Sequence, residues 1–83
     1  MYKIFFNKEA EKQYRRFPNS IIPKIRRAIL NLSKNPYVGK KLEGRLAGKY
    51  SFRAWPYRIL YLIDNKQKTI VVVSILHRQG AYK

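Results

Sequence analysis

The spacing of hydrophobic residues divides the first third of the chain into a strand and two helices. The opening segment 2–6 is rich in aromatic and branched side chains, which is typical of a strand. Asn7 then suits the N-cap of a helix, because its side chain can accept a hydrogen bond from the first turn. Ala10, Tyr14 and Phe17 recur at spacings of four and three residues, which predicts one buried face of a short helix.

The second helix is predicted to begin at Asn19 or Ser20, with Pro23 accommodated in its first turn. Its buried stripe consists of four aliphatic residues at helical spacing: Ile22, Ile25, Ile29 and Leu32. The pair Asn35-Pro36 ends this helix, because proline cannot continue the hydrogen-bond pattern.

The remainder of the chain has the pattern of a loop followed by strands. A glycine-containing loop is expected over 36–48, and three strands follow it: 49–54, 57–64 and 69–76. The continuous apolar run 70–73 predicts a strand that is covered on both faces. The order strand-helix-helix-strand-strand-strand indicates an α+β fold, in which two N-terminal helices pack on one face of a mostly antiparallel four-stranded sheet.

Composition supports a folded domain. The chain has 83 residues and no cysteine, so its core depends on side-chain packing without disulfide bonds. Hydrophobic residues make up 46% of the sequence, which excludes a disordered basic tail. No apolar run approaches the roughly 20 residues that span a bilayer, and the N-terminus lacks the features of a secretory signal. We therefore expect one domain over residues 1–83, located in the cytoplasm.

The net charge limits the kinds of molecule that this chain is expected to bind. The sequence has 19 Lys and Arg against 4 Asp and Glu, which gives a net charge of +15. Such an excess predicts binding to a polyanion, for which nucleic acid, an anionic membrane surface and an acidic protein are the options. A membrane surface is the least favoured, since neither predicted helix combines a wide apolar face with a purely basic one.

The turn at Trp55-Pro56 has a geometric consequence for two arginines. A hairpin centred on that turn places Arg53 directly opposite Arg58, on one face of the sheet. Like charges at such a position are destabilising, so an anion between the two guanidinium groups would explain the pair. The alternative is that both arginines lie over aromatic rings and have no further role.

The C-terminal segment adds groups that could take part in chemistry. His77 and Arg78 follow the last strand directly, and Tyr82 comes shortly after them. Phosphodiester cleavage requires stabilisation of negative charge, a proton acceptor and a proton donor. Arginines, an imidazole and a phenol near one hairpin could supply all three.

The chain resembles the RelE/ParE superfamily of toxins from type II toxin–antitoxin pairs, in particular its RelE-like branch. Four segments carry the resemblance: Leu42-Glu43-Gly44, Leu46-Ala47-Gly48-Lys49-Tyr50-Ser51-Phe52-Arg53, Tyr57-Arg58-Ile59-Leu60-Tyr61, and His77-Arg78 with Tyr82. Together with the strand-helix-helix opening, they span essentially the whole chain. The resemblance implies a metal-independent and cofactor-free endoribonuclease that cuts messenger RNA on the ribosome, by attack of a ribose 2′-hydroxyl on the adjacent phosphate.

The resemblance also implies roles for individual residues. The residues expected at the catalytic site are Arg53, Arg58, His77, Arg78 and Tyr82. Arg58 would contact the scissile phosphate, and His77 or Tyr82 would act as general base, because nearby arginines favour their deprotonated forms. Ser51 stands where well-known ribosome-dependent members have a lysine, and no carboxylate is expected on this face. The residues expected to bind RNA or the ribosome are Lys40, Lys41, Arg45, Lys49 and Ser51.

Two other functions fit the same sequence. A ParE-like inhibitor of DNA gyrase would share the fold without nuclease chemistry, although ParE-like members generally lack the His-Arg pair with a terminal tyrosine. A non-catalytic basic RNA-binding domain would show salt-sensitive RNA binding and no cleavage product. As a toxin, the chain is expected to have a cognate antitoxin, whose acidic segment would cover the arginine face and could add a strand to an exposed sheet edge.

Overall fold

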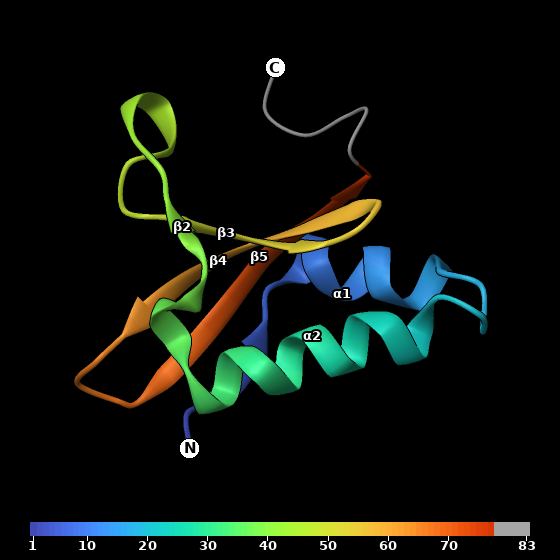
Figure 1. The fold of residues 1–83 in the computed structure, drawn as a ribbon, viewed down its shortest axis with the longest axis horizontal. Coiled ribbons are helices and arrows are strands. Elements are labelled where there is room, and N and C mark those ends of the chain that lie inside the picture. The colour runs from blue at the N-terminus through green and yellow to red at the C-terminus, as the bar shows by residue number, and fades with distance from the viewer. Residues whose placement is uncertain (78–83) are drawn as a thin grey trace.

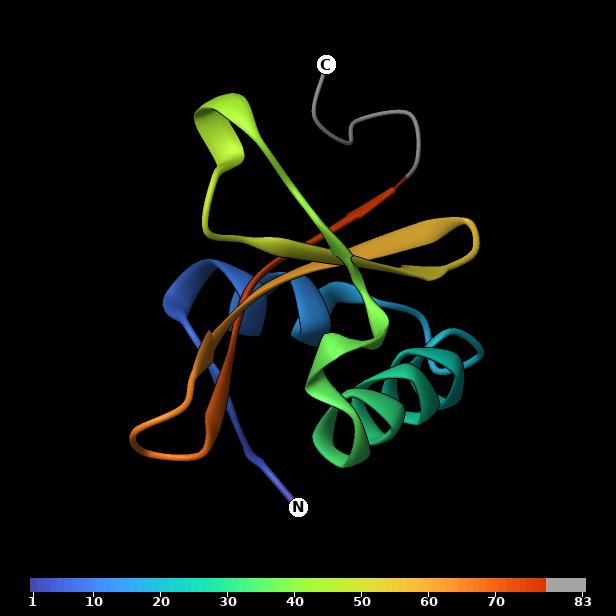
Figure 2. The same ribbon diagram turned by 60° about the vertical axis from the view of Figure 1, so that its left-hand side comes forward.

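The chain folds into a five-stranded sheet with two helices on one face (Figures 1 and 2). The computed structural model describes residues 1–77. The helices are α1 (Lys8–Arg16) and α2 (Ile22–Lys34), and two short 3-10 helices follow, η1 (Pro36–Val38) and η2 (Gly44–Leu46). The strands are β1 (Lys3–Phe6), β2 (Lys40–Lys41), β3 (Tyr50–Ala54), β4 (Tyr57–Asp64) and β5 (Thr69–His77).

The strands are arranged in the order β1-β5-β4-β3-β2. Within residues 1–77, β1 and β5 pair in parallel, and the other three strand pairs are antiparallel. The predicted α+β fold with a mostly antiparallel sheet is therefore confirmed. The sheet has five strands where four were expected, because β2 lies within the segment that was predicted as a loop. Two residues are too short a strand to produce a recognisable alternation of polar and apolar positions.

The first helix begins as the sequence predicts. The Asn7 side chain accepts a hydrogen bond from the backbone N–H of Ala10 at 2.9 Å, as an N-cap should. The Phe6 and Tyr14 rings then meet edge to face, with centroids 5.4 Å apart. These contacts fix α1 against the end of β1.

The second helix begins later than expected. Asn19 and Ser20 lie in a turn, and α2 starts at Ile22 with no side-chain cap. The backbone N–H groups of Ile21 and Ile22 both donate to the carbonyl of Pro18. The predicted helix start at Asn19 or Ser20 was therefore wrong, because these residues form a turn whose backbone hydrogen bonds to Pro18 lead into α2.

The core lies between the helices and one face of the sheet. Its largest fully buried side chains come from α2 and from the two longest strands, β4 and β5: Tyr61, Ile25, Leu32, Ile59, Ile70 and Val72. Val71 and Val73 alternate with these core positions and remain half-buried on the other side. The prediction that the run 70–73 is covered on both faces was wrong for the described residues, since both helices pack on one face (Figure 2). None of the described helices is long and apolar enough to cross a membrane.

Helix α1 also covers the edge of β5 beyond the end of β1. The side-chain oxygen of Gln13 accepts a hydrogen bond from the backbone N–H of Ile75 at 2.6 Å. Its side-chain nitrogen donates to the Ser74 hydroxyl at 3.3 Å. The face of the sheet opposite the helices, called the open face below, carries the residues that matter for function.

Candidate functional site

Arg53 and Arg58 are direct cross-strand partners on β3 and β4. The predicted register is therefore confirmed, and strand alternation places both side chains on the open face. Arg53 is exposed and Arg58 is half-buried. Two like charges at this position repel each other by a fraction of a kcal/mol up to about 1 kcal/mol. A bound anion would remove that cost.

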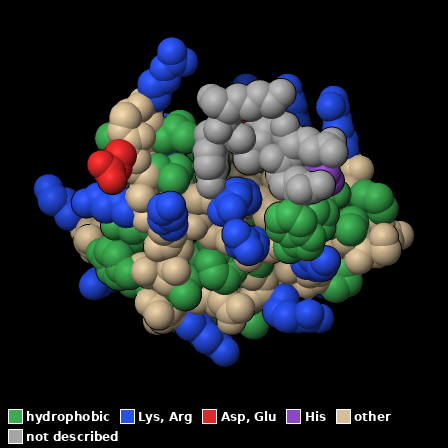
Figure 3. Space-filling model, turned by 45° about the horizontal axis from the view of Figure 1, so that its top comes forward, with side chains coloured by type: hydrophobic (Ala, Val, Ile, Leu, Met, Phe, Trp, Pro, Cys, Tyr) green, Lys and Arg blue, Asp and Glu red, His purple; other side chains and the backbone are tan. Residues whose placement is uncertain are grey.

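A cavity of about 370 Å³ opens beside the two arginines. Its lining combines three cationic side chains with backbone and a hydroxyl group: Val38, Gly39, Lys40, Ser51, Phe52, Arg53 and Arg58. No carboxylate is among these residues, so the cavity has the charge that suits a phosphate group. Lys and Arg side chains are spread over the side of the molecule that Figure 3 shows, and the acidic atoms visible there form one small group.

Ser51 lies at the bottom of this site. Its side chain is buried, at 3% exposure, and the Arg58 guanidinium approaches its hydroxyl oxygen at 3.5 Å. Lys40 is the cross-strand partner of Ser51 on β2, so its side chain is on the same face. The structure thus brings together four of the predicted site residues, and the hydroxyl of Ser51 helps to orient Arg58 toward the cavity.

Tyr61 holds the backbone that precedes β2. Its hydroxyl donates a hydrogen bond to the carbonyl of Pro36 at 2.8 Å and accepts one from the N–H of Gly39 at 3.1 Å. The side chain is fully buried, and burial raises the pKa of Tyr61 to about 12, opposed in part by the hydrogen bond from Gly39. This pair of hydrogen bonds fixes the turn from which Lys40 reaches the arginines.

Gly39 is required at its position by close approach. A Cβ atom there would collide with the Tyr61 hydroxyl oxygen and would come within 2.9 Å of the Ser51 carbonyl oxygen. The absence of a side chain lets β2 lie directly against β3 and Tyr61. Neither Gly39 nor Tyr61 was predicted as part of the site, because the two residues are 22 positions apart and only the fold brings them together.

Arg53 also contacts an aromatic ring. Its guanidinium carbon lies 5.7 Å from the centroid of the Trp55 ring, a distance typical of a cation–π interaction. The alternative that the arginines lie over aromatic faces therefore holds for Arg53. It does not exclude anion binding, since the guanidinium retains N–H donors at its edge while its face rests near the ring.

His77 is close to the hairpin, as predicted, but is directed to the other face of the sheet. It is the cross-strand partner of Tyr57, and the two rings meet edge to face at 5.4 Å. The Tyr57 ring in turn packs on Phe17, at the end of α1, with centroids 4.9 Å apart. The imidazole is thus separated from the arginine pair by the sheet. Arg78 and Tyr82, which were expected in the same site, lie outside the described residues.

The other predicted RNA-binding residues do not line the cavity. Lys41 is paired with Tyr50, so strand alternation directs it to the face opposite Lys40. Arg45 is exposed on η2, within the segment that extends away from the sheet between β2 and β3 (Figure 1). Lys49 closes that segment, with its backbone N–H donating to Leu46. These residues could contact a large anionic surface around the site.

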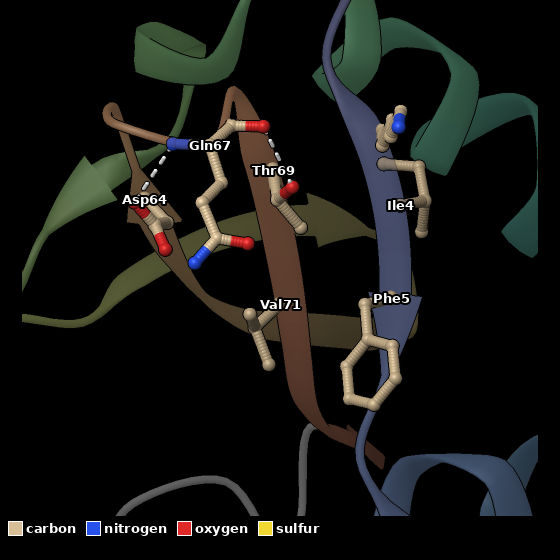
Figure 4. A pocket seen from close by; sticks show the side chains of 7 residues that line it. Ile4, Phe5, Asp64, Gln67, Thr69 and Val71 are labelled. Atoms are coloured by element: carbon tan, nitrogen blue, oxygen red, sulfur yellow. Dashed lines mark hydrogen bonds between the residues drawn. The ribbon is translucent and has the colours of Figure 1, made fainter.

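A separate cavity of about 380 Å³ lies at the far end of the sheet (Figure 4). It is formed by β1, β4 and β5 and the turn between the last two: Lys3, Ile4, Phe5, Asp64, Gln67, Thr69 and Val71. It contains none of the predicted site residues and no cluster of cations. Within residues 1–77, no group of His, Asp and Glu side chains could hold a metal ion. The arginine cavity is therefore the stronger candidate for function.

Known proteins share both the sequence and the fold. Residues 4–82 match the family described as "ParE toxin of type II toxin-antitoxin system, parDE". The toxin RelG of Mycobacterium tuberculosis is 34% identical over 84 aligned positions, which cover 99% of this chain and 97% of that protein. The crystal structure of the toxin–antitoxin complex RelBE2 from the same organism superposes with a TM-score of 0.85 at 34% identity, covering 93% of this chain and 98% of the other.

A more distant neighbour supports the fold alone. The isolated E. coli RelE toxin has a TM-score of 0.81 at 19% identity, covering 93% of this chain and 84% of the other. The family match spans nearly the whole sequence, and the RelG similarity extends over both proteins. This chain belongs to the RelE/ParE superfamily and is a toxin of a type II toxin–antitoxin system.

Proposed function

We propose that this toxin is a metal-independent endoribonuclease that cleaves messenger RNA on the ribosome. In the proposed reaction, a ribose 2′-oxygen forms a bond to the adjacent phosphorus and loses its proton to a general base. The bond from phosphorus to the 5′-oxygen of the next nucleotide breaks, and that oxygen takes up a proton. The products are a 2′,3′-cyclic phosphate and a free 5′-hydroxyl, so atoms and charge balance without a co-reactant.

The cross-strand pair of Arg53 and Arg58 is the observation that carries this proposal. During attack, negative charge grows on the phosphoryl oxygens, and two guanidinium groups at adjacent strand positions can donate hydrogen bonds to them. The repulsion between the arginines in the free protein falls as that charge develops. Lys40 adds a third cation at the same cavity. The site would therefore favour the transition state over the less charged ground state.

We assign the general base to Tyr82 in preference to His77. The His77 ring packs on Tyr57, on the side of the sheet away from Arg58, whereas the base must reach the ribose that is bound at the arginines. Arginines close to a phenol lower its pKa and favour the phenolate that would accept the proton. Arg78 is proposed as a further contact to the phosphate.

The remaining basic residues would dock the toxin on ribosomal RNA. Lys41, Arg45 and Lys49 lie on β2 and on the segment between β2 and β3, and none of them lines the cavity. Contacts from such residues supply affinity for phosphates without sequence information. Such a substrate places the toxin in the cytoplasm. The RelBE2 structure contains a toxin and its antitoxin. By analogy, we propose an antitoxin for this chain whose acidic segment covers the open face and is drawn there by complementary charge.

An inhibitor of DNA gyrase is the second candidate function, and the match to the ParE family description supports it. Expression of the toxin in a bacterial host separates the two. Truncated messages and an immediate stop in translation support the ribonuclease, whereas altered plasmid supercoiling and a DNA-damage response support the gyrase inhibitor. RNA binding without either effect would instead indicate a non-catalytic RNA-binding domain. The Arg58→Ala variant, produced at the same level, serves as the comparison in each assay.

A further inference from the structure

A second basic groove runs along the edge of β3, between that strand and α2. It has a volume of about 230 Å³. Its lining consists of residues from α2, three of them polar or cationic, and of residues from the end of β3 and the turn after it: Lys24, Arg27, Ala28, Asn31, Phe52, Arg53, Ala54 and Trp55. No carboxylate lines it. The groove exists because β2 pairs with β3 only as far as Ser51. Beyond Ser51, within the described residues, this edge of β3 lies next to α2.

The groove contains both cations and an aromatic surface. Lys24, Arg27 and Asn31 are all exposed, and their spacing of three and four residues puts them on one face of α2. The Trp55 side chain is 52% exposed at the opposite wall. The Lys24 ammonium donates to the Trp55 carbonyl oxygen at 2.8 Å, which ties the start of α2 to the hairpin. Two further N–H groups of that ammonium remain as donors.

This groove shares two lining residues with the arginine cavity on the open face. Phe52 and Arg53 line both the groove and the cavity, and their side chains alternate between the two faces of β3. Arg53 is therefore placed between the two concavities, with its guanidinium over the Trp55 ring. A polyanionic chain that is held at the arginine pair can pass over this edge and continue toward α2.

We infer that the α2–β3 groove binds a single-stranded RNA segment that flanks the segment at the arginine pair. In this assignment Trp55 stacks on a nucleobase, and Lys24 and Arg27 contact phosphates. Single-stranded RNA is recognised by aromatic side chains that stack on unpaired bases, next to cations that follow the backbone. An acidic peptide would match the cations, but it would not supply a base to stack on the indole. The inference rests on the proposed RNA substrate and does not require cleavage.

Trp55 is the sole tryptophan of the chain, so its fluorescence reports on this groove directly. The probe is a short 2′-O-methyl RNA, which the proposed reaction cannot cleave because the attacking hydroxyl is blocked. We expect this probe to quench the Trp55 emission in a saturable manner, at the same concentrations at which anisotropy of a labelled probe reports binding. Inorganic polyphosphate, which has charge but no bases, should bind with much less quenching.

Paired substitutions test the cationic wall. Lys24→Ala with Arg27→Ala should reduce the slope of log affinity against log salt by about 1.4, since each contact to a single strand contributes about 0.7. Lys12→Ala with Arg16→Ala removes the same charges from α1, where both residues are exposed, and should leave the slope nearly unchanged. Trp55→Ala should weaken binding by roughly ten-fold, as expected for the loss of one stacked base.

Three results would overturn the inference. The first is binding by anisotropy with no change in Trp55 emission. The second is an equal loss of slope in the α1 control. The third is saturable quenching by a polyglutamate peptide that depends on Lys24 and Arg27, with no quenching by the RNA, which would assign the groove to an acidic protein segment. Because the probe cannot be cut, each result leaves the proposed nuclease activity to be judged separately by cleavage of unmodified message.

Discussion

Arg53 and Arg58 face each other across β3 and β4, although both carry a positive charge and no acidic residue lines the cavity beside them. Pairing like charges opposes folding slightly, by up to about 1 kcal/mol. The arrangement becomes favourable when a phosphate lies between the two guanidinium groups, each of which can donate two hydrogen bonds to oxygen. The arginine pair therefore lowers the stability of the free protein but favours anion binding. Several measurements can separate these two effects.

Replacing Arg58 with glutamine should leave the free energy of unfolding unchanged or raise it by up to about 1 kcal/mol, because the repulsion is removed. Inorganic phosphate should raise the Tm of the native protein through binding to the folded state, and the Arg58→Gln variant should lose most of that increase. Thermal unfolding with and without phosphate measures both quantities. Arg26→Gln, on the exposed side of α2, provides the control with equal net charge. An equal loss in that control would contradict the assignment of the anion to the arginine pair.

Replacing Tyr61 with phenylalanine should destabilise the fold by about 1–3 kcal/mol, since the Pro36 carbonyl and the Gly39 N–H lose their buried partner. For a domain of this size, each kcal/mol lowers Tm by roughly 4–8 °C. Urea unfolding gives the free energy directly. The matched control is Tyr37→Phe, whose hydroxyl bonds to Asn65 at an exposed site and whose loss should cost little. Equal effects of the two substitutions would show that the hydrogen bonds of Tyr61 are unimportant.

The pH dependence of the unfolding free energy should reveal the raised pKa of Tyr61. Its pKa is about 12 in the folded protein and 10.0 for the ordinary phenol, so the unfolded chain loses this proton more readily. The contribution of Tyr61 is therefore fully present below pH 10 and is lost as the pH rises toward 12. Unfolding free energies of native protein and Tyr61→Phe should differ by a constant amount up to about pH 10 and converge above it. A difference that does not change between pH 9 and 12 would contradict the raised pKa.

Gly39→Ala should cost about 1–3 kcal/mol, because the added methyl group meets the Tyr61 hydroxyl and the Ser51 carbonyl. Part of that collision disappears when Tyr61 is phenylalanine. The double variant should therefore be more stable than the sum of the two single effects predicts, with a coupling of at least 0.5 kcal/mol. Additive effects in urea unfolding would mean that Gly39 and Tyr61 do not act on each other.

The two candidate bases should differ in their effect on cleavage. Tyr82→Phe is expected to lower the rate by at least 10²-fold, in the range typical of a lost general base, and His77→Ala by less than ten-fold. The reason is the position of the His77 ring against Tyr57, on the far side of the sheet from Arg58. Rates on unmodified message at saturating toxin provide the comparison. A larger loss of cleavage rate for His77→Ala than for Tyr82→Phe would identify His77 as the general base.

Sequence reasoning succeeded where a local rule determines the structure. The α1 cap at Asn7 and the register of Arg53 with Arg58 each depend on a few neighbouring residues, so periodicity and turn position were sufficient. The order of helices and strands followed from the same patterns. The resemblance to known toxins identified the family, and the similarity to RelG supports that assignment.

The features that were missed depend on contacts between distant segments. The face of His77 follows from its pairing with Tyr57, and the ladder between β4 and β5 contains an irregularity at Leu60 and Tyr61 that no local pattern reveals. The role of Gly39 follows from a tyrosine 22 residues away. Strand β2 forms because these contacts hold its backbone, since its sequence Lys40-Lys41 has no strand pattern of its own.

The central claim is that the arginine pair makes this toxin a ribonuclease, and mapping of message ends tests it most directly. Purified toxin is incubated with ribosomes programmed with a defined message, and the 5′ ends of the products are located by primer extension. We expect cuts within the codon in the ribosomal A site, lowered by at least 10²-fold in Arg58→Ala and retained in Arg26→Ala. Intact message in the presence of native toxin, or equal cutting by Arg58→Ala, would contradict it.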